Sequence, residues 1–117
     1  MSDTCNCQND QRHVHEFTGS TAVFLECDEC HNHRFCTVSG EAMGEPARHV
    51  HEITFRTDFA DGHYHEFYGK TTPPIMVGNG KHVHFIKEVT EPEDNHRHMF
   101  QGATLIDSPI DFDYHKQ

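Results

Sequence analysis

Residues 49–57, with the sequence HVHEITFRT, decide the fold of this 117-residue chain. Two histidines separated by one residue are followed by an isoleucine two positions later and by a threonine four positions after that. A period of two places alternate side chains on opposite faces of a β-strand. One face carries the histidines, the isoleucine and the threonine, whereas Glu52, Thr54 and Arg56 lie on the other. The stretch therefore predicts a strand whose inner face is lined by histidine.

The same pattern, His-x-His-x-Phe/Ile-x-x-x-Thr/Ser, occurs six times and includes twelve of the thirteen histidines. The six units begin at His13, His31, His49, His63, His82 and His96. Consecutive units pair into a repeat of about 32–36 residues that is present three times, and turn residues such as Asp61-Gly62 separate units. We predict an all-β fold: three two-stranded repeats form a small six-stranded antiparallel barrel, or a barrel-like sheet, with pseudo-threefold symmetry.

The pattern also predicts the organisation of the chain. A single β domain is expected over residues 12–110, with repeats at about 12–47, 48–80 and 81–110. Residues 1–11 are polar and lack the pattern, so we expect a disordered N-terminal tail, and residues 111–117 are expected to form a C-terminal tail.

Antiparallel strands with these sequences place large residues opposite small ones, which favours dense packing. At one end the small partners are Thr37, Gly69 and Gly102. At the other end the corresponding positions hold Gly19, Phe55 and Glu88. We expect either a distortion at that end or a hydrogen bond from an imidazole to Glu88.

Composition excludes several classes of partner. Acidic residues outnumber basic ones by 19 to 9, and the net charge of −10 argues against binding to nucleic acid, which needs a basic surface. No apolar run approaches the ~20 residues of a membrane helix, and no leader resembles a signal peptide. We expect a cytoplasmic protein whose partners are metal ions. We expect no binding to nucleic acid or to a membrane, and formation of a homo-oligomer stays open.

Alternating strand directions bring the histidines together at the two ends of the sheet. The first cluster is expected to contain His13, His15, His49, His51, His82 and His84. The second cluster is expected to contain His31, His33, His63, His65, His96 and His98. Six imidazoles supply the six nitrogens of an octahedral metal site, and buried imidazoles without a partner would cost ~1–3 kcal/mol each. The pattern thus predicts two metal centres and no catalytic residue.

Ligand chemistry narrows the choice of metal. Structural zinc prefers four ligands, so six nitrogens favour Fe(II), Ni(II) or Co(II). Two other interpretations remain open: Zn(II) sites with three or four histidines, and a solvated polar face without metal. The leading function is structural metal binding, or metal storage and buffering. The alternatives are a metalloenzyme with an open coordination position and a metal-stabilised interaction module whose outward residues are Val83, Phe85 and Val89.

The five cysteines are a separate feature. Their odd number and the absence of a leader argue against a disulfide framework. Cys5 and Cys7 together with Cys27 and Cys30 have zinc-ligand spacing, but the predicted strands place the two pairs at opposite ends. Cys27 and Cys30 are then a redox pair, a partial metal entry site or neutral loop residues, and Cys36 is a surface thiol.

The amino-acid sequence of several segments resembles that of the YmaF family of small bacterial proteins over roughly residues 12–110. The segments that carry the resemblance are residues 13–17, 31–35, 38–42, 56–59, 77–80, 82–85 and 103–106. A looser resemblance links the His-x-His units to the trimeric needle tip of long phage tail fibres, which binds octahedral iron with such units from three chains. This second resemblance implies Fe(II) as the first choice of metal.

Overall fold

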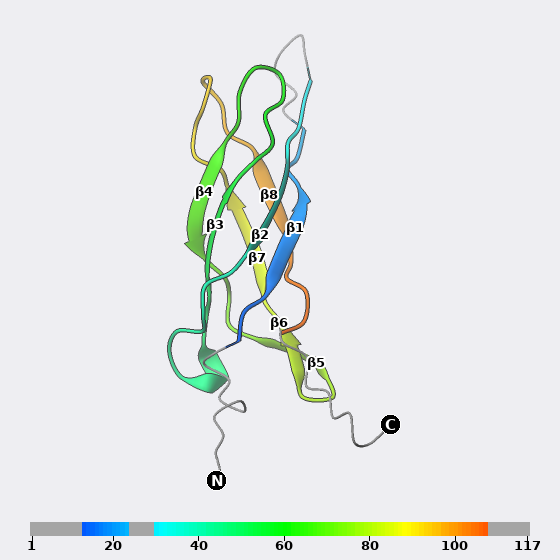
Figure 1. Ribbon diagram of the computed structural model, residues 1–117, viewed down its shortest axis with the longest axis vertical. Helices are drawn as coiled ribbons and strands as arrows, with labels where there is room; N and C mark the ends of the chain where they lie inside the picture. Colours follow the sequence, from blue (N-terminus) through cyan, green and yellow to red (C-terminus); the bar gives the residue numbers. More distant parts are fainter. Residues whose placement is uncertain (1–12, 24–29, 108–117) are drawn as a thin grey trace.

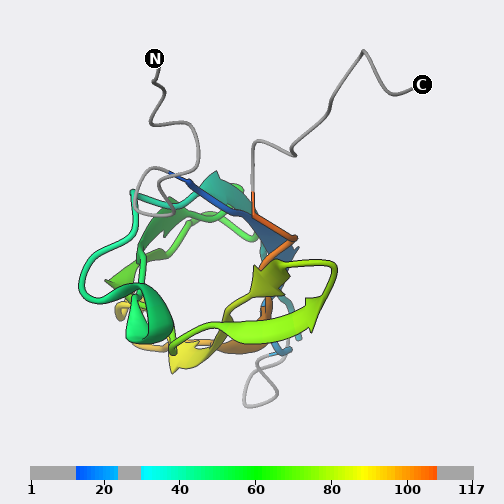
Figure 2. The same ribbon diagram turned by 90° about the horizontal axis from the view of Figure 1, so that it is seen from below.

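The computed structural model describes residues 13–23 and 30–107, and this part of the chain is all-β with no α-helix. The chain runs up and down along one long axis (Figure 1) and winds around that axis when viewed from below (Figure 2). The strands are β1 (Glu16–Ser20), β2 (Arg34–Val38), β3 (Glu52–Arg56), β4 (Glu66–Lys70), β5 (Ile75–Gly78), β6 (Lys81–Val83), β7 (Phe85–Val89) and β8 (Met99–Ala103). A short 3-10 helix, η3 (Pro46–Arg48), precedes β3.

The strands form four two-stranded antiparallel sheets: β1-β2, β3-β4, β5-β6 and β7-β8. The prediction of six strands in three repeats is therefore wrong, because residues 75–83, which include the first histidine of the fifth unit, form a sheet of their own. Asn79 and Gly80 have φ of 53° and 73°, and this left-handed turn pairs Gly78 with Lys81. β5-β6 is thus a hairpin that the histidine period does not encode.

The described sheets do not close into a barrel, which also differs from the prediction. Neighbouring sheets are joined beyond the strand ends, for example by backbone bonds from Gly40 N to Glu52 O and from Asp58 N to Arg34 O. Near the middle of β2 and β3, the Thr37 hydroxyl donates to Thr54 O at 2.7 Å, a side-chain bond rather than a backbone ladder.

The predicted register within the sheets is confirmed. Phe17 pairs with Thr37, Ile53 with Gly69 and Ile86 with Gly102, so small residues lie opposite large ones. A Cβ atom on Gly69 would lie only 2.7 Å from Cζ of Phe67, which leaves no room for a side chain. Glu88, which pairs with Phe100, is exposed, so the alternative in which a buried imidazole donates a hydrogen bond to this glutamate is wrong.

The core lies between the two ends of the strands. It contains the Phe or Ile of every histidine unit together with Phe55, and the buried residues are Phe17, Phe35, Ile53, Phe55, Phe67, Ile86 and Phe100. Phe35 and Phe55 stack with ring centroids 4.3 Å apart. Phe55 therefore fills the space that a small residue would leave, and the core separates the two groups of histidines.

Two further observations concern the rest of the chain. No helix in the described segments is long and apolar enough to cross a membrane. The tails predicted over residues 1–11 and 111–117 lie outside the described residues.

Candidate metal centres

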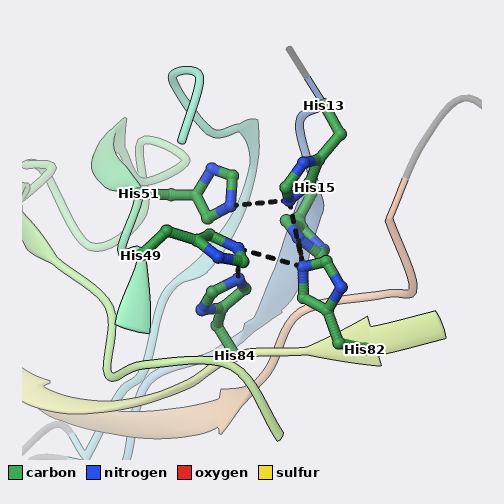
Figure 3. A group of neighbouring side chains, drawn as sticks. All are labelled: His13, His15, His49, His51, His82 and His84. Carbon is green, nitrogen blue, oxygen red and sulfur yellow. Dashed lines mark hydrogen bonds between the residues drawn. The ribbon is translucent and has the colours of Figure 1, made fainter. Parts of the chain in front are cut away.

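The first cluster contains six buried histidines at one end of the folded molecule (Figure 3). His13 and His15 precede β1, His49 and His51 precede β3, and the last two histidines lie in and just after β6. Their Nε2 atoms face one another: His82 Nε2 lies 3.0 Å from that of His13 and 3.1 Å from those of His15 and His49. All six ligand atoms lie within 4.8 Å of one another.

The arrangement of the six rings is octahedral. Edge-to-face contacts join the described rings in every pairing except three that share no member: His13/His84, His15/His49 and His51/His82. These three pairs correspond to the opposite corners of an octahedron. Division of an edge of 3.1 Å by √2 places the common centre about 2.2 Å from each nitrogen, close to the ~2.0–2.1 Å of a metal–imidazole bond such as that of zinc.

The second cluster gathers the other six histidines at the opposite end. His31, His33, His63, His65 and His98 form a group in which the ligand atoms lie within 4.8 Å of one another. His96 lies outside that group by this criterion, yet its Nε2 is 3.1–3.2 Å from the Nε2 atoms of His31, His63, His65 and His98. His31 is half-buried, whereas the other five are buried. The structure thus brings together both predicted sets.

The inner histidine of every unit is held by its Nδ1 atom. Each Nδ1 lies 2.8–3.1 Å from a backbone carbonyl of a neighbouring sheet. The pairs are His15–Leu105, His33–Asp58, His51–Gly40, His65–Glu91, His84–Thr72 and His98–Ala22. Because a carbonyl can only accept, Nδ1 carries the proton and the Nε2 lone pair of the neutral ring points toward the centre of the cluster.

The threonine or serine that ends each unit holds the backbone of an inner histidine in the partner strand. Thr71, for example, accepts from His51 N at 3.1 Å, and its own amide donates to His51 O at 2.9 Å. The Thr71 hydroxyl also lies 3.3 Å from His84 Nδ1 and donates to Thr72 O, the carbonyl that anchors His84. The sequence pattern contains this residue but assigned it no role; its fixed spacing from the histidines was the available signal.

Several outer histidines are anchored by the turns that precede them. His49 Nδ1 donates to Pro46 O in η3 at 2.7 Å, and His63 Nδ1 donates to Asp61 O at 3.0 Å. His82 Nδ1 lies 3.6 Å from the Asp107 carboxylate, which also accepts from His82 N at 3.1 Å. These contacts orient outer rings in the same sense as the inner ones.

Residues 10–106 match the YmaF family, described as spore germination protein GerY/YamF. The chain belongs to the YmaF family. The match covers both histidine clusters and confirms the resemblance seen in the sequence. No curated protein and no solved structure matches this chain.

Burial sets the protonation of the inner histidines in this YmaF protein. Loss of hydration, together with a smaller effect of nearby imidazoles, lowers the pKa of His15, His51, His84 and His98 to about 4. Burial likewise lowers the pKa of His33 and His65. The inner rings are therefore neutral at pH 7, which is the form that binds metal.

Neutral rings with protonated Nδ1 atoms create an electrostatic problem at the cluster centres. The dashed lines in Figure 3 join pairs of Nε2 atoms. When both rings carry their proton on Nδ1, both Nε2 atoms are acceptors and no hydrogen bond forms between them. Rings whose Nδ1 atoms both donate to carbonyls, such as His84 with His49 and His63 with His96, have their Nε2 atoms 3.1–3.2 Å apart. Lone pairs at this distance repel one another in a buried site, and a cation at the centre would convert this repulsion into attraction.

The remaining candidate residues from the sequence are the cysteines and the outward-facing apolar residues near the start of the fifth histidine unit. Cys30 and Cys36 are exposed free thiols, as predicted for Cys36, whereas Cys5, Cys7 and Cys27 lie outside the described residues. Val89 is exposed, and Val83 and Phe85 are half-buried.

Proposed function

We propose that this YmaF protein binds two transition-metal ions, one in each histidine cluster, through six imidazole nitrogens per ion. The observation that carries this proposal is the convergence of buried Nε2 lone pairs at both ends while Nδ1 protons are engaged elsewhere. Left empty, each buried acceptor would cost ~1–3 kcal/mol. A divalent ion supplies one common partner for all six acceptors.

We favour Fe(II) as the metal, with Ni(II) and Co(II) as close alternatives and Zn(II) as a further one. Six nitrogens in an octahedral arrangement suit the first three ions better than zinc, which prefers four ligands.

The metal in this proposal has a structural role. The imidazole of each inner histidine is bonded to one sheet while its backbone is bonded within another, as for His51 with Gly40 and Thr71. A metal that joins six such residues therefore also joins the sheets at their ends. Metal storage or buffering is the second role within this function, and it requires that the fold persists after the ion leaves. We carry over the family's description, spore germination, as the biological setting.

A metalloenzyme is the alternative function. His31 is half-buried, whereas the other histidines of the two clusters are buried, so it is the ligand most open to water. Departure of this one ligand would open a coordination position, which catalysis at a metal requires.

A cobalt titration of the metal-free protein tests the proposal. We expect saturation at two equivalents of Co(II) per chain, with the weak visible absorption of six-coordinate cobalt. The intense absorption of four-coordinate cobalt would contradict the octahedral assignment, and the absence of any cobalt binding would contradict the function. Measurement of water exchange on the bound ion distinguishes the enzyme alternative, because a filled site has no exchangeable water.

A further inference from the structure

The second cluster is surrounded by aspartates that the proposed function does not use. Asp61 Oδ2 lies 3.3 Å from His31 Nδ1, and the carbonyl oxygen of the same aspartate accepts from His63 Nδ1 at 3.0 Å. One residue thus contacts two imidazoles that belong to different histidine units. The Asp61 side chain is about one-third exposed and lies beside the half-buried His31.

Asp94 repeats this arrangement one step around the cluster. Its carbonyl oxygen accepts from His96 Nδ1 at 3.0 Å, and its Oδ2 lies 3.7 Å from His63 Nδ1. His63 is therefore contacted by the backbone of one aspartate and the carboxylate of the next.

Turn geometry alone does not explain why these residues are aspartates. Asp61 and Asp94 have φ of 56° and 55° and begin two-residue turns in which the next residue also has positive φ. Asn79 occupies the same position with φ of 53° in the β5-β6 turn, and asparagine tolerates this conformation as well as aspartate does. The carboxylate charge is thus dispensable for the turn, and its placement beside an imidazole Nδ1 calls for another reason.

The Asp61 carboxylate lies where it can accept the Nδ1 proton of His31, which makes that imidazole a stronger electron-pair donor at Nε2. The Asp94 carboxylate, 3.7 Å from a His63 Nδ1 that already donates to Asp61 O, acts on His63 through its charge. Two such negative groups also stabilise a more highly charged ion at the centre. Both effects favour a trivalent ion over a divalent one.

We propose that Asp61 and Asp94 are positioning residues that strengthen His31 and His63 as ligands and shift the second cluster toward the trivalent state of its metal. This inference rests on the proposed function. For iron, the step is loss of one electron from Fe(II) to a one-electron acceptor, which gives Fe(III) with the same six nitrogen ligands and no change in protonation.

The test is a redox titration of the iron-loaded protein with soluble mediators, followed by the spectrum of Fe(III). The variant is Asp61→Asn with Asp94→Asn, which keeps residues suited to the turns. We expect two one-electron components in the unmodified protein. In the variant, the midpoint potential of one component should rise, while the midpoint potential of the other should not change. A tenfold loss of preference for Fe(III) corresponds to a rise of about 59 mV.

The matched control is Glu91→Gln with Glu93→Gln, which removes two exposed carboxylates from the same end of the chain. Equal shifts in both double variants, or no shift in the aspartate variant, would overturn the proposal, because a general charge effect would then suffice. A protein that binds Co(II) but not iron is tested by competition with a chelator, where the aspartate variant should lose 10–100-fold in affinity at one of two sites. Failure of the unmodified chain to bind any metal would instead contradict the proposed function.

Discussion

The two histidine clusters hold their inner histidines in the same way and their outer histidines in different ways. At both ends, the backbone N–H of each inner histidine donates to the hydroxyl of a threonine or serine, and its Nδ1 donates to a carbonyl just after a strand of the neighbouring sheet. The outer histidines differ: His49 is anchored by η3, His82 belongs to the separate β5-β6 sheet, and His63 follows a tight turn at Asp61. The repeated unit therefore sets the inner three ligands, and local turns set the outer three.

The largest expected effect comes from deletion of two ligands at one end. His82→Ala with His84→Ala should remove about one metal equivalent and leave the second cluster loaded. His96→Ala with His98→Ala should do the reverse, because the buried core separates the clusters. The metal content of each purified variant checks this comparison, and loss of both ions from either variant would indicate one coupled centre instead of two.

Acid should separate the two ends in the order of their exposure to water. Burial lowers the pKa of the inner histidines at both ends, to about 4 for His15, His51, His84 and His98. All six histidines of the first cluster are buried, whereas His31 in the second is half-buried, so water reaches the second cluster more easily. A buried neutral histidine stabilises the fold above its unfolded pKa of 6.5, and this contribution declines as the pH falls from 6.5 toward the folded value. We expect two steps of metal release between these limits, the second cluster first. Retention of all metal at pH 4 would contradict this account.

The inner shell can be weakened without removal of a ligand. Thr71→Val keeps the shape of the side chain but leaves His51 N without its acceptor and removes a contact to His84. The expected loss is ~1–3 kcal/mol in the free energy of unfolding, measured with denaturant. Thr54→Val, on the exposed face of β3, is the matched control and should change stability by less than ~0.5 kcal/mol. Similar losses of stability in both variants would show that the hydrogen bonds of the Thr71 hydroxyl do not stabilise the fold.

The smallest effect is expected at Asp107, which supports His82 from outside the first cluster. Asp107→Asn retains an oxygen that accepts from His82 N, so the metal affinity of the first cluster should fall by less than tenfold. Asp107→Ala removes the acceptor, and the metal affinity of the first cluster should then fall by at least ~10-fold, the lower limit for the loss of such a supporting group. Competition with a chelator measures both, and equal affinities in the two variants would show that the carboxylate oxygen is not a support.

The sequence period predicted the strands, their register and the membership of both clusters, because alternation directly specifies which side chains share a face. It did not predict β5-β6, where three exposed apolar residues, Ile75, Met76 and Val77, follow no alternation. Nor could it show that the sheets stay open, since closure depends on distances between strands of different sheets. The anchoring carbonyls of Gly40 and Leu105 were also invisible, because any residue supplies a backbone oxygen.

The most direct test of the account is elemental analysis of untagged protein purified without chelators or nickel resin. The account predicts about two equivalents of a transition metal per chain, with iron first and nickel or cobalt next. A folded protein that contains no metal would contradict the central claim that the two histidine clusters are metal centres.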